Sequence, residues 1–334
     1  MNKLRDYLKN LKNSNVLVIG DIILDHYIWG KVNRISPEAP VPVVFVTKEN
    51  IVPGGSSNVA LNISSVNGKA TLCGVIGNDQ FGKNLLKILN ERNVDTSGVF
   101  IDNNRHTTVK TRVIAQHQHI VRIDKEEIYE ISDEILKKIG NFLKLNSKKF
   151  NVIVISDYAK GLITKKLVGM IKDTFDSVFL IADPKVKNEN LYKGFDLITP
   201  NRKEAFEIAK IVDDGTDKTL IKAGKKIMKE LKIPNLLITR GEEGMSLFTE
   251  KKHIKIPTFA QEVFDVSGAG DTVVALLSTA VSSGLDLIKS CIIANIAASV
   301  VVGKMGTATT TINEIEKRWS LMDKSLRKQL EAFF

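Results

Sequence analysis

A short glycine-rich segment carries the clearest chemical signal in the sequence. It runs from Asp265 to Asp271 and reads Asp-Val-Ser-Gly-Ala-Gly-Asp, directly before an apolar stretch that predicts a helix. Gly268, Ala269 and Gly270 let the backbone approach an anion closely, and their amides would lie at a helix N-terminus, where partial positive charge collects. Asp271 could then accept a proton from a hydroxyl group that attacks the bound phosphate. The alternative is a helix start whose glycines only permit close packing.

A second glycine-rich segment has the spacing of a P-loop but not its chemistry. Gly77 to Lys83 matches that motif, whereas Asn84 stands where a magnesium-binding Ser or Thr is required. Asp79, inside the same segment, would repel a phosphate. We therefore predict an ordinary turn between a strand and a helix here.

Other polar residues follow apolar runs further along the chain. Asn201 and Glu204, three positions apart after Pro200, could hold a hydrated magnesium ion beside phosphates. The segment from Thr239 to Gly241 could wrap a nucleotide phosphate, but a plain hairpin turn explains that pattern equally well. Both are candidates for the nucleotide side of a site.

A carboxylate and a glycine pair nearer the N-terminus could bind a polyol. Asp21 follows the first apolar run and could accept two hydroxyl hydrogen bonds, as a carboxylate does when it binds a sugar diol. Gly54, Gly55 and Asn58 precede a helical pattern and could bring backbone and amide groups against the same ligand. A glycine turn followed by a helix cap explains these three residues too.

The elements that must position these residues alternate along the chain. Short apolar runs predict buried strands, and amphipathic patterns between them predict helices. The expected strands are 15–20, 150–156, 178–182, 196–199 and 235–239; the expected helices are 57–66, 81–92, 132–145, 164–174, 202–210, 218–231, 269–281, 285–302 and from 313 onward. This order is typical of a mostly parallel sheet with helices on both faces, which binds ligands beyond the carboxyl ends of its strands.

Two segments interrupt the alternation. Residues 27–48 contain three closely spaced prolines, and residues 106–124 alternate apolar and polar side chains, so both predict exposed antiparallel strands. We expect a small β lid whose strands are inserted at about 22–48 and 105–124 of the sequence. Because no linker or repeat divides the chain, we predict a single domain over residues 1–334.

Composition and charge exclude several classes of protein. With 43% hydrophobic and 26% charged residues, the chain is neither a disordered nor a fibrous protein. The net charge is +10 (48 Lys and Arg minus 38 Asp and Glu), but the lysines are scattered, so we expect no nucleic-acid partner. The longest apolar stretch, near residues 292–303, is too short for a membrane span, and the first apolar run is too short for a signal peptide. We expect a cytoplasmic protein.

Taken together, these motifs resemble those of the ribokinase (PfkB-type) family of carbohydrate kinases, over nearly the whole chain. The resemblance implies a ribokinase-like three-layer α/β sandwich with a mostly parallel central sheet and a small β lid. It also implies phosphoryl transfer from ATP, with magnesium, to a sugar. Asp271 would be the general base, and the backbone of Gly268, Ala269 and Gly270 would form the anion hole.

The resemblance also assigns residues to the two substrates. On the nucleotide side it implies Lys185, Asn201, Arg202, Lys203, Glu204, Thr239, Arg240, Gly241, Gly244 and Asn295, with Asn201 and Glu204 organising the magnesium-bound phosphates. On the sugar side it implies Asp21, Gly54, Gly55, Asn58 and Asp157. For a phosphate carried by the sugar itself, charge and position alone indicate Arg34, Arg112 and Lys160.

Three further stretches are more specific than the glycine-rich motif. Residues 34–43, 156–161 and 300–307 closely resemble the branch of the family that phosphorylates D-glycero-D-manno-heptose 7-phosphate in ADP-heptose synthesis. That resemblance implies transfer to the anomeric O1, giving heptose 1,7-bisphosphate. Another kinase of the same fold, acting on fructose, ribose or fructose 6-phosphate, is the nearest alternative. A catalytically silent sugar or nucleotide sensor is a second alternative.

The same resemblance implies partners. Related kinases dimerise through the lid, so we expect a homodimer whose exposed lid strands pair with a second copy. In many bacteria this kinase is fused to a nucleotidyltransferase, whose His-x-Gly-His signature is missing from the sequence. We therefore expect a separate nucleotidyltransferase to act on the product.

Overall fold

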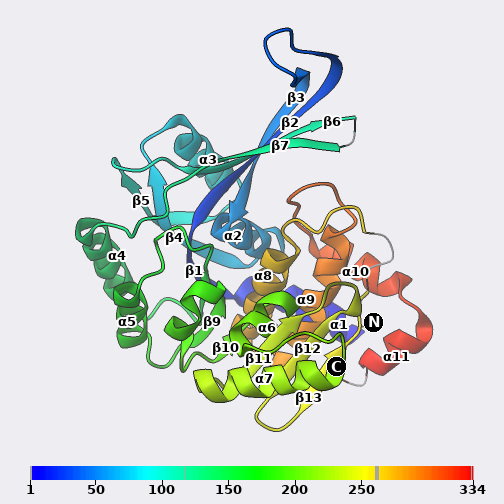
Figure 1. The fold of residues 1–334 in the computed structure, drawn as a ribbon. Coiled ribbons are helices and arrows are strands. Elements are labelled where there is room, and N and C mark those ends of the chain that lie inside the picture. The colour runs from blue at the N-terminus through cyan, green and yellow to red at the C-terminus, as the bar shows by residue number, and fades with distance from the viewer. Residues whose placement is uncertain (1, 117, 260–262, 332, 334) are drawn as a thin grey trace.

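The computed structural model describes residues 2–116, 118–259, 263–331 and 333. Within these residues, the centre is a nine-stranded sheet in the order β13-β12-β11-β10-β9-β8-β1-β4-β5 (Figure 1). Its strands are β1 (Asn15–Gly20), β4 (Lys69–Gly77), β5 (Asp95–Asp102), β8 (Val152–Ser156), β9 (Phe179–Asp183), β10 (Leu197–Ile198), β11 (Asn235–Thr239), β12 (Met245–Thr249) and β13 (His253–Ile256). Neighbouring strands from β5 to β11 pair in parallel, and β12 and β13 add an antiparallel edge.

Helices cover both faces of this sheet, as the sequence predicts. Val16 and Val18 of β1 belong to the apolar cluster on one face, and Leu17 and Ile19 belong to the cluster on the other face. The first cluster includes residues of α1 (Asn2–Asn10), α2 (Ser56–Ser65), α3 (Gln80–Glu91), α8 (Ala269–Ser282), α9 (Leu287–Val301), α10 (Ile312–Leu321) and α11 (Lys324–Glu331). The second includes residues of α4 (Asp133–Leu145), α5 (Lys165–Thr174), α6 (Arg202–Ala209) and α7 (Asp217–Leu231). The result is a three-layer α/β sandwich.

Side-chain caps begin the helices of the second layer. The hydroxyl groups of Ser132, Thr164 and Thr216 accept hydrogen bonds from backbone N–H groups in the first turns of α4, α5 and α7. Short 3-10 helices, η1 (Leu11–Asn13), η2 (Val186–Tyr192) and η3 (Gly241–Glu243), complete the connections. These polar starts follow directly from the residue types that precede each amphipathic run.

Four more strands form a second sheet, in the order β3-β2-β6-β7 among the residues described. They are β2 (Ile22–Ile35), β3 (Pro42–Gly55), β6 (Thr108–Ala115) and β7 (Gln118–Lys125). Figure 1 shows the long strands β2 and β3 projecting beyond the main sheet. This is the predicted lid, although β3 continues further than expected, to the glycine pair that begins α2.

The loop between β4 and α3 is closed by its own aspartate. One oxygen of Asp79 accepts a hydrogen bond from the Gly82 N–H, and the other accepts one from the Thr107 N–H, both at 2.8 Å. The first contact caps α3, and the second ties this helix to the start of β6. The loop is therefore the strand-to-helix turn predicted from the sequence, and the Gly82 N–H is used by Asp79 and is not available to a phosphate.

We predict that Asp79→Ala lowers the free energy of unfolding by about 1–2 kcal/mol, because it removes a helix cap and a tie to the lid. Urea denaturation of both proteins measures the difference. Asp173→Ala, which changes an exposed aspartate of α5, is the matched control and is expected to change the free energy by less than about 0.5 kcal/mol. Equal effects of the two substitutions would contradict the role of Asp79.

Across the described residues, no helix is both long and apolar enough to cross a membrane.

Candidate active site

Polar residues that follow or end the parallel strands, most of them predicted from the sequence, meet at one edge of the main sheet. Asp21 follows β1, Asp157 follows β8, Asp183 ends β9 and Thr239 ends β11, and these parallel strands present their carboxyl ends to the same side. The N-terminus of α8 meets this edge, because Asp271 at its start contacts the residue after Asp157. The arrangement matches the ligand position expected for a parallel α/β sheet.

Asp271 is buried in the first turn of α8, and both of its carboxylate oxygens accept hydrogen bonds. Asn58 Nδ2 donates to Oδ2 at 2.8 Å, and the Tyr158 hydroxyl donates to Oδ1 at 2.7 Å. Burial raises the pKa of Asp271 to about 6, against the lowering effect of these two donors. The group is thus ionised at neutral pH yet has a proton affinity suited to general-base chemistry.

The backbone in front of Asp271 leaves room for an anion. Gly268 caps α8 in the left-handed conformation (φ 76°), and a Cβ there would lie 2.9 Å from the Asn58 amide nitrogen. A Cβ at Gly270 would meet nothing within 4 Å, so the space beside the helix start is open. These glycines let a phosphate approach the positive end of the helix, where the Ala269 N–H already donates to the Val266 carbonyl oxygen at 3.2 Å.

A cavity of about 580 Å³ opens beside this helix start. Its lining combines glycines and polar groups with apolar side chains that could cover the faces of a planar base. It is lined by Thr239, Gly241, Glu242, Gly244, Met245, Thr258, Val263, Val266, Ala269, Gly270, Val273, Asn295, Ala298, Ser299 and Val302. The structure therefore brings together four residues predicted for the nucleotide: Thr239, Gly241, Gly244 and Asn295.

Arg240 does not line that cavity, although the sequence placed it there with its neighbours. Its side chain is only 6% exposed and forms ion pairs with Asp217 and Glu243. A further hydrogen bond joins it to the Ser246 hydroxyl. The acidic groups of α7 and η3 thus hold the guanidinium away from the cavity. The segment from Thr239 to Gly244 lines the cavity with Thr239 and its two glycines instead.

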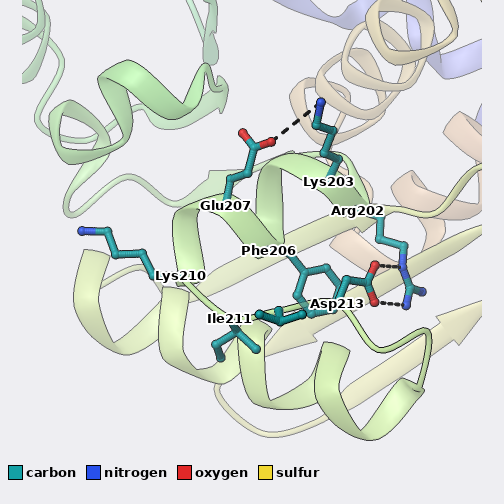
Figure 2. Close-up of a pocket in the computed structure, with 8 residues that line it drawn as sticks. Arg202, Lys203, Phe206, Glu207, Lys210, Ile211 and Asp213 are labelled. Carbon is teal, nitrogen blue, oxygen red and sulfur yellow. Dashed lines mark hydrogen bonds and ion pairs between the residues drawn. The ribbon is translucent and has the colours of Figure 1, made fainter.

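Arg202 and Lys203 also turn to neighbouring acids. The Arg202 guanidinium donates two hydrogen bonds to the Asp213 carboxylate, at 2.6 and 2.7 Å. Lys203 points to Glu207, one turn along α6, and Figure 2 shows both pairs. These residues line a separate surface pocket with Phe206. Their placement on the nucleotide side therefore lacks support from side-chain geometry, because local ion pairs hold both cations.

Asn201 and Glu204 form the capping box of α6. The Asn201 side chain accepts from the Glu204 N–H at 2.9 Å, and the Glu204 carboxylate accepts from the Asn201 N–H at 3.0 Å. The second carboxylate oxygen of Glu204 pairs with Lys185 Nζ at 2.6 Å. Asn201 and Glu204, whose spacing suggested a magnesium site, thus cap the start of α6. Glu204 also orients Lys185 toward the site.

Carboxyl groups nevertheless gather at this end of the sheet, although Asp183 is mostly protonated at neutral pH. Burial, together with Glu204 and Asp271, raises the pKa of Asp183 to about 8. Among the described residues, no group of three or more His, Cys, Asp or Glu side chains could hold a metal ion by itself. The residues present fit a magnesium ion that is bound mainly by phosphates and water and only assisted by protein carboxylates.

Asp21 is held by the loop that follows β8. Its Oδ2 accepts from the Tyr158 N–H at 2.8 Å and from the Lys160 N–H at 3.2 Å, and burial raises its pKa to about 6. Gly55 adopts a left-handed conformation, and a Cβ there would lie 2.7 Å from the Asp21 carbonyl oxygen. The glycine pair therefore lets β3 and α2 pass directly against the end of β1.

The Asp157 carboxylate is used inside the protein. Its Oδ1 accepts from the Ala159 N–H, and its Oδ2 accepts from Asn188 Nδ2 at 2.8 Å and from the Tyr192 hydroxyl at 2.5 Å. Asp157 is 1% exposed. Its observed contacts anchor η2 and shape the loop after β8, and none of them is directed toward a sugar.

The three cations predicted for a sugar phosphate lie in different places. Arg112 pairs with Asp25 at 2.5 Å and lines a cavity of about 720 Å³ between the lid and the loop before α8. Lys160 pairs with Glu126 at 2.6 Å. Arg34 is exposed near the far end of β2, opposite Val43 of β3. Of the three, only Arg112 lines a cavity next to the proposed site.

Three residues at the site were not singled out from the sequence. Tyr158 contacts Asp271; Asp25 lies at the base of the lid and accepts from Thr307 Oγ1 at 3.0 Å; Asp183 lies beside Glu204. Asp183 ends an apolar strand, as the other site acids follow theirs, which is a signal the sequence does contain. The contacts of Tyr158 and Asp25 join segments far apart in the chain, so no local pattern reveals them.

Comparisons with known proteins agree with this geometry. Residues 13–314 match the model of the pfkB family of carbohydrate kinases. The chain is 43% identical to the protein named "Bifunctional protein HldE" of Pelobacter propionicus, over 91% of this chain and 63% of that protein. It is also 43% identical to the protein of the same name in Aliarcobacter butzleri, over 94% of this chain and 66% of that protein. The chain thus spans slightly less than two thirds of these relatives.

Solved structures show the same fold at lower identity. Ribokinase from Arabidopsis thaliana, complexed with ribose and ATP, superimposes with a TM-score of 0.73 at 20% identity, covering 91% of this chain and 98% of that chain. Phosphofructokinase-2 from Escherichia coli superimposes with a TM-score of 0.78 at 18% identity, covering 92% of this chain and 98% of that chain. Fold, motifs and family match lead to one conclusion: this chain belongs to the pfkB family of carbohydrate kinases, enzymes that transfer a phosphoryl group to a sugar.

Proposed function

We propose that the protein transfers the γ-phosphoryl group of magnesium-ATP to the anomeric O1 of D-glycero-D-manno-heptose 7-phosphate, giving heptose 1,7-bisphosphate and ADP. The observation that carries the reaction type is the buried Asp271 carboxylate at the open N-terminus of α8. The heptose assignment is supported by the three sequence stretches at residues 34–43, 156–161 and 300–307. ATP as the donor implies a cytoplasmic reaction.

The nucleotide occupies the cavity beside α8 in this proposal. Its base lies among the apolar side chains, and its phosphates extend toward Gly268, Ala269 and Gly270. The N–H groups there and the Lys185 ammonium stabilise the charge that gathers on the transferred group. Bound magnesium supplies further neutralisation of phosphate charge. Lys185 is already directed by Glu204, so little reorganisation is required.

The sugar lies between the start of α8 and the glycine pair. Asp21 accepts hydrogen bonds from its hydroxyl groups, and the Asn58 amide donates to them. The reacting O1 faces Asp271. The O1 proton moves to the Asp271 carboxylate while O1 bonds to the γ-phosphorus and the bond to the ADP oxygen breaks. The product leaves with the phosphoryl group, and Asp271 returns its proton to solvent.

We predict that Asp271→Asn lowers kcat by about 100-fold or more, because the substitution removes the proton acceptor while the side chain keeps nearly the same size. The dissociation constant for ATP, measured by calorimetry, is expected to stay close to that of the parent protein. Turnover near the parent value in this variant would remove Asp271 from the base position.

The pH dependence of kcat tests the same group in the unaltered protein. Because burial raises the pKa of Asp271 to about 6, the carboxylate becomes protonated as the pH falls through that value. Only the ionised form can accept a proton, so kcat is expected to rise between about pH 5 and 7 and then to level off. A kcat that stays constant across this range would contradict the assignment.

The phosphate of the sugar itself is proposed to lie in the cavity between the lid and the loop before α8. Arg112 and Lys31 line that cavity, and Asp25 orients the Arg112 guanidinium. We predict that Arg112→Ala raises the KM for the sugar phosphate by about 10-fold or more, since a charge-assisted contact is lost. Arg92→Ala, an exposed arginine elsewhere, is the control, and equal KM values for both variants would exclude Arg112.

A homodimer through the lid is also part of the proposal. The lid strands leave several large apolar side chains exposed: Ile35, Phe45, Val46, Val121 and Ile123. A second copy would cover this surface and the edges of the lid sheet. A separate nucleotidyltransferase that consumes the product remains an expectation.

We predict that the protein sediments as a dimer at micromolar concentration and that Phe45→Glu shifts it toward the monomer, because Phe45 is 69% exposed on β3 and the charge would oppose burial. Analytical ultracentrifugation of both proteins measures this. A parent protein that sediments as a monomer would contradict the dimer.

The substrate is tested by ADP release with magnesium-ATP and a panel of heptose 7-phosphate, fructose 6-phosphate, fructose and ribose. Activity confined to the heptose phosphate, and lost in Asp271→Asn, is the expected result. Activity on another sugar of the panel alone would keep the kinase but discard the heptose. Binding of nucleotide with no turnover of any sugar would favour a sensor.

A further inference from the structure

We propose that Tyr158 is a positioning residue for the reaction, which fixes the Asp271 carboxylate in the orientation that accepts the sugar proton. The inference rests on the proposed role of Asp271 as the base. The Tyr158 hydroxyl lies 2.7 Å from Asp271 Oδ1, and Asn58 Nδ2 lies 2.8 Å from Oδ2. Two donors on opposite oxygens define the plane of the carboxylate, which rotation about a single side-chain bond would otherwise leave free.

The main chain of Tyr158 holds the second acid of the site. Its N–H donates to Asp21 Oδ2 at 2.8 Å, while its side chain reaches Asp271. One residue therefore connects the carboxylate proposed to bind the sugar with the carboxylate proposed to take its proton. The relative position of the two acids depends on this connection.

The loop that carries Tyr158 has a strained and tightly held backbone. Ala159 adopts a left-handed conformation (φ 56°), which is costly for a residue with a Cβ. The Asp157 carboxylate, itself anchored by Asn188 and Tyr192, accepts from the Ala159 N–H. Gly161, at φ 90°, passes so close to Tyr129 that a Cβ would lie 1.9 Å from its carbonyl oxygen. These contacts hold the backbone that follows Tyr158 in place.

The ring of Tyr158 also faces the phosphate side of the site. Lys185 Nζ lies 5.5 Å from the ring centroid, within the range of a cation–π contact, and pairs with Glu204. Burial, with Asp271 and Asp183 nearby, raises the pKa of Tyr158 well above its usual range. The hydroxyl therefore stays protonated over the whole working pH range and can donate to the ionised Asp271.

A tyrosine hydroxyl suits this position because it can both donate and accept. The Asn58 amide nitrogen can only donate, so it favours the ionised form of Asp271. When Asp271 takes the proton, the Tyr158 hydroxyl can turn and accept a hydrogen bond from the new O–H. The base thus keeps a partner in both protonation states, which lowers the cost of the transfer.

The acidity of Asp271 depends on all the groups that face it. Asp25 of β2 raises its pKa, and Lys185 lowers it together with Asn58 and Tyr158. Asp183 of β9 is a further carboxylate in this field. Loss of the Tyr158 donor alone should therefore raise the pKa of Asp271, with the other groups unchanged.

The test is Tyr158→Phe, which keeps the ring and removes only the hydroxyl. We expect kcat to fall about 10-fold or more, the KM for ATP to stay unchanged, and the acid limb of the kcat–pH profile to move to higher pH. Tyr129→Phe is the matched control, because the Tyr129 hydroxyl donates to the Asn104 carbonyl oxygen and not to an acid of the site. Parent values of kcat and of the acid limb in Tyr158→Phe would overturn the proposal.

A double-mutant cycle separates positioning from a general structural effect. If Tyr158 acts through Asp271, adding Tyr158→Phe to Asp271→Asn should cause little further loss of kcat. A full additional loss in the double variant would show that Tyr158 acts elsewhere, and would overturn the proposal.

The outcome does not depend on the heptose assignment. The measurements use whichever sugar of the panel the parent protein phosphorylates, so a wrong heptose leaves the test of Tyr158 intact. If no sugar reacts, a ¹³C NMR titration of labelled aspartate side chains reports the pKa of Asp271 directly. A higher value in Tyr158→Phe supports the positioning contact, and equal values in the two proteins would overturn it.

Discussion

The burial of one carboxylate at the start of α8 is the constraint on which the rest of the site depends. Moving Asp271 out of water is costly, and the structure offsets that cost with the Asn58 amide, the Tyr158 hydroxyl and the positive end of the helix. Each of these partners comes from a different part of the chain. The base can therefore exist only when α2, the loop after β8 and α8 are packed together, so folding and the assembly of the site are one event.

Other acids of the site also use their carboxylates to hold neighbouring groups in place. Asp157 uses its carboxylate to hold the loop that carries Tyr158, and Glu204 uses its own to cap α6 and to orient Lys185. In the structure, the contacts of these two predicted ligands place neighbouring groups: the loop after β8 for Asp157, and Lys185 and the start of α6 for Glu204. Open space remains beside the helix start at Gly270 and in the two adjoining cavities.

Much of this arrangement could be predicted from the sequence, and the exceptions share a cause. Apolar runs ending in polar residues predicted β1, β8, β9, β10 and β11 and the edge where the site lies, and the segment before Asp271 predicted the helix start. The ion pairs of Arg202 and Arg240 could not be predicted, because only the folded chain brings Asp213 and Asp217 against them. The edge strand β5 was not predicted, because its apolar run, Val99 to Ile101, is short and polar residues flank it. Tyr158 lies in the specific stretch 156–161, but its contact with Asp271, more than a hundred positions away, is visible only in the fold.

The measurement that tests the central claim most directly is a rapid-quench single turnover of the parent protein and Asp271→Asn, with saturating magnesium-ATP and the sugar phosphate that the parent accepts. It isolates the chemical step from product release, which limits turnover in many kinases. If Asp271 is the base, phosphoryl transfer itself slows by about 100-fold or more in the variant while nucleotide binding is unchanged. A chemical step of equal rate in the two proteins would contradict the role of the buried carboxylate.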